Sequence, residues 1–215
     1  FVYFQDDCFG ASKKWLARFA REYEGYPYHC HLRADIIDDD MAHLLAESNC
    51  YSVHVALETA NEEYRKKMLG RRMSNDTIID GINRLKRKGI KIMLQNMIGL
   101  PGTTIDDDLE TLDFNRMVKP DYAWCSIYQP YPGTVLGDEC RKNMVVGEFK
   151  PSFFESSPLG FDEKHLRALE VLQKEFALAV KHNYHPVPLT PHHFMERAYH
   201  RCRDEADQLL FRGHV

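Results

Sequence analysis

Two adjacent carboxylates, Asp6 and Asp7, follow a short apolar run at residues 1–4. Paired carboxylates can serve acid–base catalysis or bind a cation. They can equally cap a following helix, because a carboxylate there accepts hydrogen bonds from free backbone N–H groups. Both interpretations stay open for this pair.

Charged residues also follow the next two apolar runs, at Arg33, Asp35 and Glu58. Arg33 could clamp a carboxylate or phosphate through two parallel hydrogen bonds, or it could pair internally with Asp35. Glu58 comes directly after the apolar segment 53–57, where a carboxylate without a partner is costly. A carboxylate at that position suits ribose hydroxyls or an ammonium group.

Two turns follow later strand-like runs. The turn at residues 99–102 has the sequence Gly-Leu-Pro-Gly, and its glycines let the backbone approach a flat ligand closely. The turn at residues 131–134 begins with Tyr131, an aromatic ring that could cover an adenine. Neither turn is specific by itself, because many tight turns share this composition.

The six cysteines and eleven histidines predict no metal site in this chain. No two cysteines form a C-x2-C or C-x3-C pair, and no H-E-x-x-H is present. His192 and His193 are adjacent, so their side chains would diverge on a helix. We expect the histidines to lie at the surface or to be hydrogen-bonded in the core, and the cysteines to act as small apolar residues.

Strand-like and helical runs alternate along the chain, which predicts βαβ units and a parallel sheet. Ser12 and Ser74 are candidate helix N-caps, and Gly89 is a candidate helix end. Because parallel strands share one carboxyl edge, we expect the polar groups above to meet there. Strands are expected at residues 1–4, 28–33, 51–57, 90–97 and 121–127, and helices at about 12–23, 38–47, from 61 or 62 onward, and at 74–88, 106–117, 162–182 and 191–210.

The composition suits one globular domain of 215 residues with 44% hydrophobic residues. A net charge of −4 gives no basic excess that would point to nucleic acid, and no apolar run approaches the roughly 20 residues of a membrane span. Phe1 begins inside an apolar run, whereas natural ends are usually polar and exposed, so we expect a piece of a longer protein. The cysteines favour a reducing compartment, and we expect a cytoplasmic location.

Taken together and in order, several segments resemble the radical S-adenosylmethionine superfamily, most closely the group whose members often carry an N-terminal cobalamin-binding domain. The segments are residues 4–9, 30–38, 50–61, 69–75, 95–102 and 127–134. The resemblance implies an α/β fold: a partial parallel (β/α) barrel over residues 1–146, without its first strand. Residues 147–215 would form a C-terminal loop and helical extension.

The resemblance also implies a cofactor site at the strand ends. Glu58 would approach the ribose or amino group of S-adenosylmethionine, and Arg71 would pair with its methionyl carboxylate. The family's glycines on either side of that Glu are Ala56 and Ala60 in this chain. Along the adenosine the resemblance places Gln95, Asn96, Ile98 and Gly99, and near the adenine Tyr131; we add Arg33 to the cofactor site, and Asp6, Asp7 and Asp35 as residues near the substrate.

In the family, a 4Fe–4S cluster binds a C-x3-C-x2-C motif that follows the first strand. This sequence contains neither that strand nor that motif. We therefore expect the S-adenosylmethionine-binding part of a radical enzyme, inactive as this fragment. The resemblance implies methyl transfer, rearrangement or another radical step, with an electron donor for the cluster. Whether cobalamin is used stays open, because the domain that binds it would lie upstream. The substrate would be a small molecule or a peptide.

Two other functions fit the residues. The first is a non-catalytic α/β-barrel domain that binds a nucleotide-like ligand or a partner protein. The second is a hydrolytic or aldol-type barrel that uses Asp6, Asp7 and Glu58. This second function lacks a Lys or His placed as a base at a strand end.

Overall fold

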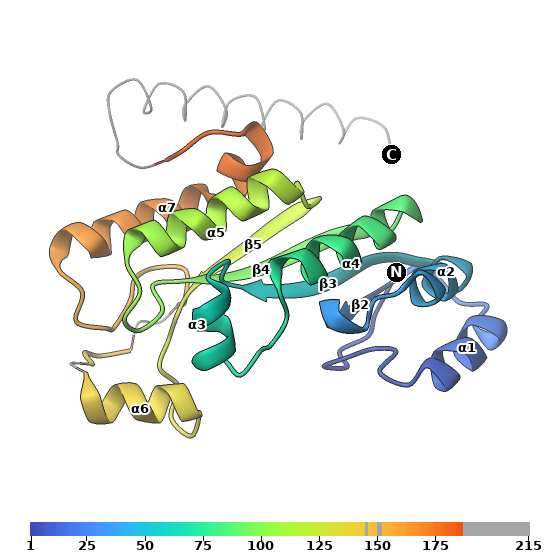
Figure 1. The fold of residues 1–215 in the computed structure, drawn as a ribbon, viewed down its shortest axis with the longest axis horizontal. Coiled ribbons are helices and arrows are strands. Elements are labelled where there is room, and N and C mark those ends of the chain that lie inside the picture. The colour runs from blue at the N-terminus through green and yellow to red at the C-terminus, as the bar shows by residue number, and fades with distance from the viewer. Residues whose placement is uncertain (145, 150–151, 187–215) are drawn as a thin grey trace.

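A computed structural model describes residues 1–144, 146–149 and 152–186 of the chain. Within it, five parallel strands are hydrogen-bonded in sequence order, β1-β2-β3-β4-β5, and form a curled half-barrel (Figure 1). The predicted α/β partial barrel is confirmed. The strands are β1 Val2–Tyr3, β2 Tyr28–Leu32, β3 Cys50–Glu58, β4 Lys91–Ile98 and β5 Tyr122–Ile127.

Helices connect these strands, and a polar side chain caps the start of each α-helix. Ser12 and Ser74 are N-caps as predicted, each accepting a backbone N–H three residues on. The short helix α6 was not predicted, and the predicted helix at 191–210 lies outside the described residues. The helices are α1 Lys13–Glu22, α2 Asp39–Glu47, α3 Glu62–Lys67, α4 Asn75–Arg87, α5 Ile105–Val118, α6 Val135–Asn143 and α7 Glu163–His182, with the 3₁₀ turn η1 Ala34–Ile36.

Alternate residues of each strand point to opposite faces of the sheet. One face is apolar: Val53 and Val55 of β3 are fully buried with Leu45 of α2 and Ile82 of α4. Figure 1 shows α4, α5 and α7 lying along the same side of the strands. The other face carries larger polar and aromatic side chains, among them His54, Gln95 and Trp124.

The apolar face continues into the last helix. Ala123 of β5 packs in one cluster with Leu112 of α5 and with Leu169 and Phe176 of α7. Part of the predicted C-terminal extension therefore shares a core with the sheet. Within the described residues, no helix combines the length and hydropathy that crossing a bilayer requires.

One polar pair is built into this core. The Asn96 side-chain amide donates to the Trp124 carbonyl at 2.8 Å, and the Asn115 amide donates to Asn96 Oδ1 at 2.7 Å. Both asparagines are fully buried. Because buried amides are stable only when hydrogen-bonded, the pair fixes α5 against β4 and β5.

Candidate functional site

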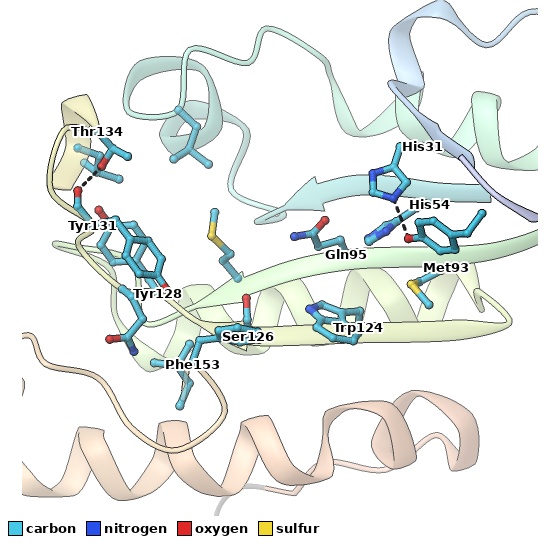
Figure 2. Close-up of a pocket in the computed structure, with 16 residues that line it drawn as sticks. His31, His54, Met93, Gln95, Trp124, Ser126, Tyr128, Tyr131, Thr134 and Phe153 are labelled. Atoms are coloured by element: carbon cyan, nitrogen blue, oxygen red, sulfur yellow. Dashed lines mark hydrogen bonds between the residues drawn. The ribbon is translucent and has the colours of Figure 1, made fainter. Parts of the chain in front are cut away.

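Two adjoining cavities, each of about 640 Å³, open on the inner face of the half-barrel. Both are lined by His31, His54, Leu69 and Gln95, so they meet along one shared wall. The polar cavity also contains Asp7, Arg33, Glu58 and Arg71. The aromatic cavity also contains Tyr3, Trp124, Tyr128, Tyr131 and Phe153 (Figure 2).

Glu58 is the most constrained residue of the polar cavity. It ends β3 just after an irregularity in the β3–β4 register, and its φ of 68° lies in the left-handed region that non-glycine residues rarely adopt. Only 6% of the residue is exposed. Backbone strain of this kind persists where the surrounding structure enforces it, and it clusters at ligand sites.

The Glu58 carboxylate has one paired and one unpaired oxygen. Its Oε1 lies 2.9 Å from an Nη of Arg71, whereas its Oε2 is buried without a hydrogen-bond partner among the described residues. Burial raises the pKa of Glu58, and the Arg71 charge opposes that rise. The site therefore holds a carboxylate that still has an acceptor to offer.

Arg71 is positioned by a second arginine. Arg65 of α3 is fully buried and donates to the Thr59 and Met73 carbonyls and to Asn75 Oδ1. Its own carbonyl accepts the Arg71 backbone N–H at 3.0 Å. Arg65 thus ties the end of β3 to the segment that carries Arg71.

The remaining charged residues divide between the cavity and the solvent. Arg33 forms two parallel hydrogen bonds to Asp35, at 3.1 and 2.8 Å, and this pairing lowers the pKa of the Asp35 carboxyl. The internal Arg33–Asp35 pair left open by the sequence is therefore present, although Arg33 also lines the polar cavity. Asp7 lines that cavity too, whereas Asp6 is exposed and lines neither. Neither aspartate caps α1.

Gln95 and Tyr131 both line the cavities, but at different places. Gln95 stands in the shared wall, where its amide reaches both spaces. Tyr131 is half exposed at the far end of the aromatic cavity (Figure 2). Its ring stacks against Phe149, with ring centroids 6.1 Å apart. Both positions are compatible with contacts to a ligand that spans the two cavities.

Three predicted cofactor residues do not line either cavity. Asn96 points to the opposite face, into its pair with Asn115. Ile98 is buried in the cluster that packs against α7. The Gly99 N–H donates to Asp108 Oδ1 at 3.0 Å, away from the cavities. The side chains of Asn96 and Ile98 therefore point away from both cavities, and the approach of the Gly99 backbone to a cofactor stays a prediction.

Gly99 instead has a structural requirement, which a substitution tests. Its φ is 65°, and an added Cβ would meet a Leu169 methyl at 2.9 Å. We expect Gly99→Ala to lower the free energy of unfolding by about 1–2 kcal/mol for the left-handed conformation, with a further loss from the contact. Urea unfolding measures the sum of the two losses.

Gly89→Ala is the matched control, because Gly89 has a φ of 75° and nothing within 4 Å of its added Cβ. Gly99→Ala should destabilise the chain more than Gly89→Ala does. Equal losses would show that the Leu169 contact is unimportant.

Histidines that the sequence did not single out occupy the centre of the inner face. His29 and His31 on β2 and His54 on β3 offer ring nitrogens that all lie within 4.8 Å of one another. Burial and the neighbouring His31 lower the pKa of His29 and of His54 to about 4. His54 departs from the expectation of surface or hydrogen-bonded histidines, because its two ring nitrogens are buried and, in the described structure, only the nearby Gln95 amide acts on them.

The described cysteines do not form a cluster site. Among the described residues, the histidine group above is the one set of three or more potential ligands that could hold a metal ion. Cys50 and burial raise the pKa of the Cys30 thiol, which disfavours the thiolate that iron–sulfur ligation needs. The described residues therefore offer no ligand set for a 4Fe–4S cluster.

Curated relatives share part of this sequence. An uncharacterized methyltransferase of Pyrococcus horikoshii is 26% identical over 149 residues, which cover 67% of this chain and 32% of that protein. A tRNA-2-methylthio-N(6)-dimethylallyladenosine synthase of Thermoanaerobacter sp. is 28% identical over 106 residues, 47% of this chain and 22% of the enzyme. The chain thus spans a third or less of the length of these relatives.

Solved structures share the fold. The radical S-adenosylmethionine methyltransferase TsrM of Kitasatospora setae, with tryptophan and a cofactor analogue bound, superposes with a TM-score of 0.58 at 17% identity, over 80% of this chain and 36% of that one. Coproporphyrinogen III oxidase of Escherichia coli superposes with a TM-score of 0.55 at 16% identity, over 76% of this chain and 34% of that one. The family model described as the radical SAM superfamily matches residues 6–114, half of the chain, from Asp6 to a point within α5. The chain therefore belongs to the radical SAM superfamily.

Proposed function

We propose that this chain is the S-adenosylmethionine-binding part of a radical SAM enzyme whose reaction is a methyl transfer, a rearrangement or a related radical step. One observation carries the proposal: the buried Glu58 carboxylate at the carboxyl end of β3, which pairs with the partly exposed Arg71 and keeps one oxygen unpaired. The methyltransferase and methylthio-transferring relatives support this reaction class.

The charges of the polar cavity complement those of the proposed ligand. S-adenosylmethionine presents a carboxylate, an ammonium group and ribose hydroxyls. Arg71 has guanidinium donors beyond the one that meets Glu58, and they suit the carboxylate. The unpaired Glu58 oxygen suits the ammonium group or a ribose hydroxyl, because it is an acceptor that is already desolvated.

The shared wall and the aromatic cavity suit the rest of the ligand. The Gln95 amide both donates and accepts, so it can bind an adenosine edge between the two cavities. The aromatic cavity then has room for the adenine beneath Tyr131 or for the substrate, since flat apolar surfaces favour stacked rings.

The radical step itself requires a 4Fe–4S cluster, and the described residues offer no ligands for one. In this proposal the chain binds and orients S-adenosylmethionine, and its inner face keeps water from the reacting groups. The cluster and its electron donor, cobalamin, and a cytoplasmic setting remain sequence-based predictions.

Calorimetric titration of the 215-residue chain with S-adenosylhomocysteine tests the binding site without any reductant or cluster. We expect saturable binding that methionine or adenosine alone does not reproduce, because each carries only part of the complementary groups. Folding is checked in parallel by circular dichroism. A folded chain that gives no binding heat at any concentration used would refute the proposed site.

The second candidate is a non-catalytic binding module, favoured by the lack of cysteine ligands among the described residues. Anaerobic reconstitution of the full gene product with iron and sulfide separates the two functions. A reducible cluster and 5′-deoxyadenosine formation would support the enzyme. A product that binds S-adenosylhomocysteine but assembles no cluster would support the binding module.

A further inference from the structure

The pairing of β2 and β3 brings His29, His31 and His54 together. His29 and His31 are two residues apart on β2, so both side chains emerge on the same face of the sheet. His54 is the direct register partner of His31 on β3. Three imidazoles from two neighbouring strands therefore converge on the inner face.

The convergence is close. The His31 and His54 rings have centroids 4.7 Å apart, and Figure 2 shows them side by side at one end of the aromatic cavity. The His29 ring centroid lies 6.0 Å from that of His31 and 6.1 Å from that of His54. Each residue offers a nitrogen within 4.8 Å of the other two.

These nitrogens are short of hydrogen-bond partners. Among the described residues, His29 Nε2 and both ring nitrogens of His54 are buried with no partner in hydrogen-bonding geometry, although the nearby Gln95 amide opposes the lowering of the His54 pKa. A buried polar atom left unpaired costs about 1–3 kcal/mol, so three such atoms in one place call for an occupant. A cation that accepts one lone pair from each ring would satisfy one nitrogen of His29 and one of His54, while the second nitrogen of His54 carries a hydrogen.

Hydrogen bonds hold two of the three rings, those of His29 and His31. His29 Nδ1 lies 2.8 Å from the Ser52 hydroxyl, which leaves Nε2 to face the other histidines. His31 Nε2 lies 2.8 Å from the Tyr3 hydroxyl. A histidine ligand is normally held in place through its second ring nitrogen, and this fixes which lone pair meets the metal.

We propose that His29, His31 and His54 form a three-histidine site for a borderline divalent cation of the Zn²⁺ class, with its open coordination position facing the two cavities. Imidazoles select Zn²⁺, Co²⁺ and related ions, whereas Mg²⁺ and Ca²⁺ need oxygen ligands that this set lacks. Nitrogens bound tetrahedrally at about 2.0–2.1 Å from one ion lie about 3.4 Å apart. The three nitrogens lie within 4.8 Å of one another, so metal binding requires the rings to rotate toward the ion.

The open position has a functional meaning. Three protein ligands and one exchangeable water are typical of zinc sites that act on a substrate rather than serve the fold. His31 and His54 line both cavities, so a ligand in either space could replace that water. The proposed metal site does not depend on S-adenosylmethionine binding, so the two proposals are tested by separate experiments.

Titration of the metal-free 215-residue chain with Co²⁺, and then competition with Zn²⁺, tests the site. We expect one equivalent of Co²⁺ to give the intense visible absorption of tetrahedral coordination, and Zn²⁺ to abolish it. Ser52→Ala should weaken binding about 10- to 100-fold, as expected for loss of a group that orients a ligand. His54→Leu should abolish the absorption.

His43→Ala is the matched control, because His43 is exposed on α2 and contributes nothing to the cluster. It should bind Co²⁺ like the parent chain. His54→Leu also removes two unpaired buried nitrogens, so its metal-free thermal midpoint should not fall, and loss of binding then reports the ligand rather than the fold. Absence of tetrahedral absorption in the parent chain, or its retention in His54→Leu, would overturn the proposal.

Discussion

The Glu58→Gln variant is expected to bind S-adenosylhomocysteine more weakly than the parent chain by about 1–3 kcal/mol, the usual loss when a charged hydrogen bond is removed. Glutamine keeps the size of the side chain but removes the charge that meets a ribose hydroxyl or an ammonium group. Calorimetric titration of the two proteins measures the difference. Because Glu58 is buried beside Arg71, the variant also leaves that arginine without its partner.

Glu63→Gln provides the control, since Glu63 lies exposed on α3 with a solvent-screened ion pair to Lys67. Its affinity should match that of the parent chain. A double-mutant cycle with Arg71→Gln then separates the ligand contact of Glu58 from its ion pair. Unchanged affinity in both Glu58→Gln and Arg71→Gln would remove these residues from the site.

The Arg65→Met variant is expected to lower the free energy of unfolding by about 2–5 kcal/mol, because each buried carbonyl left without a donor costs about 1–3 kcal/mol. Arg65 is fully buried, and its guanidinium satisfies the carbonyls of Thr59 and Met73. Methionine fills a similar volume but leaves both acceptors buried without donors. Urea unfolding followed by circular dichroism gives the change.

Lys66→Met is the comparison, because Lys66 is the exposed neighbour on the same helix. It should change stability by less than about 0.5 kcal/mol, as surface substitutions usually do. Arg65→Met should also weaken S-adenosylhomocysteine binding, since Arg65 holds the segment that carries Arg71. If the two variants unfold at the same urea concentration, Arg65 does not anchor that segment.

The strands and most helices could be predicted from local chemistry. Ser12 and Ser74 precede helical periodicity and cap it as expected, because a side-chain oxygen at an N-cap is recognisable without tertiary context. Helix α6 has the same kind of cap at Thr134. Its nine residues contain few apolar side chains, so no periodic pattern revealed it.

The direction in which strand residues point limited the prediction of the site. Gln95 and Asn96 are consecutive in β4, so only one of them can face the cavity. Gln95 does, whereas Asn96 belongs to the core. In a parallel strand both faces can be apolar, and the sequence around these residues does not say which face meets the helices.

The histidine cluster was missed for a related reason. Metal motifs are usually sought as short spacings on helices and loops, such as H-E-x-x-H. Here the useful pattern was His29-x-His31, which puts two rings on one face of a strand. The third member, His54, becomes a neighbour only when the β2–β3 register is known.

The two faces of the half-barrel have different functions: one packs against the helices, and the other lines the cavities. Residues that hold the helices, such as Val53, Val55 and Leu94, alternate with cavity residues such as His54 and Gln95 along the same strands. Substitutions on the inner face can therefore alter which molecule is accommodated while the packing that keeps the chain folded stays intact. Over evolutionary time, such a lineage can diversify its chemistry by drift at every second strand position, without first acquiring compensating stability.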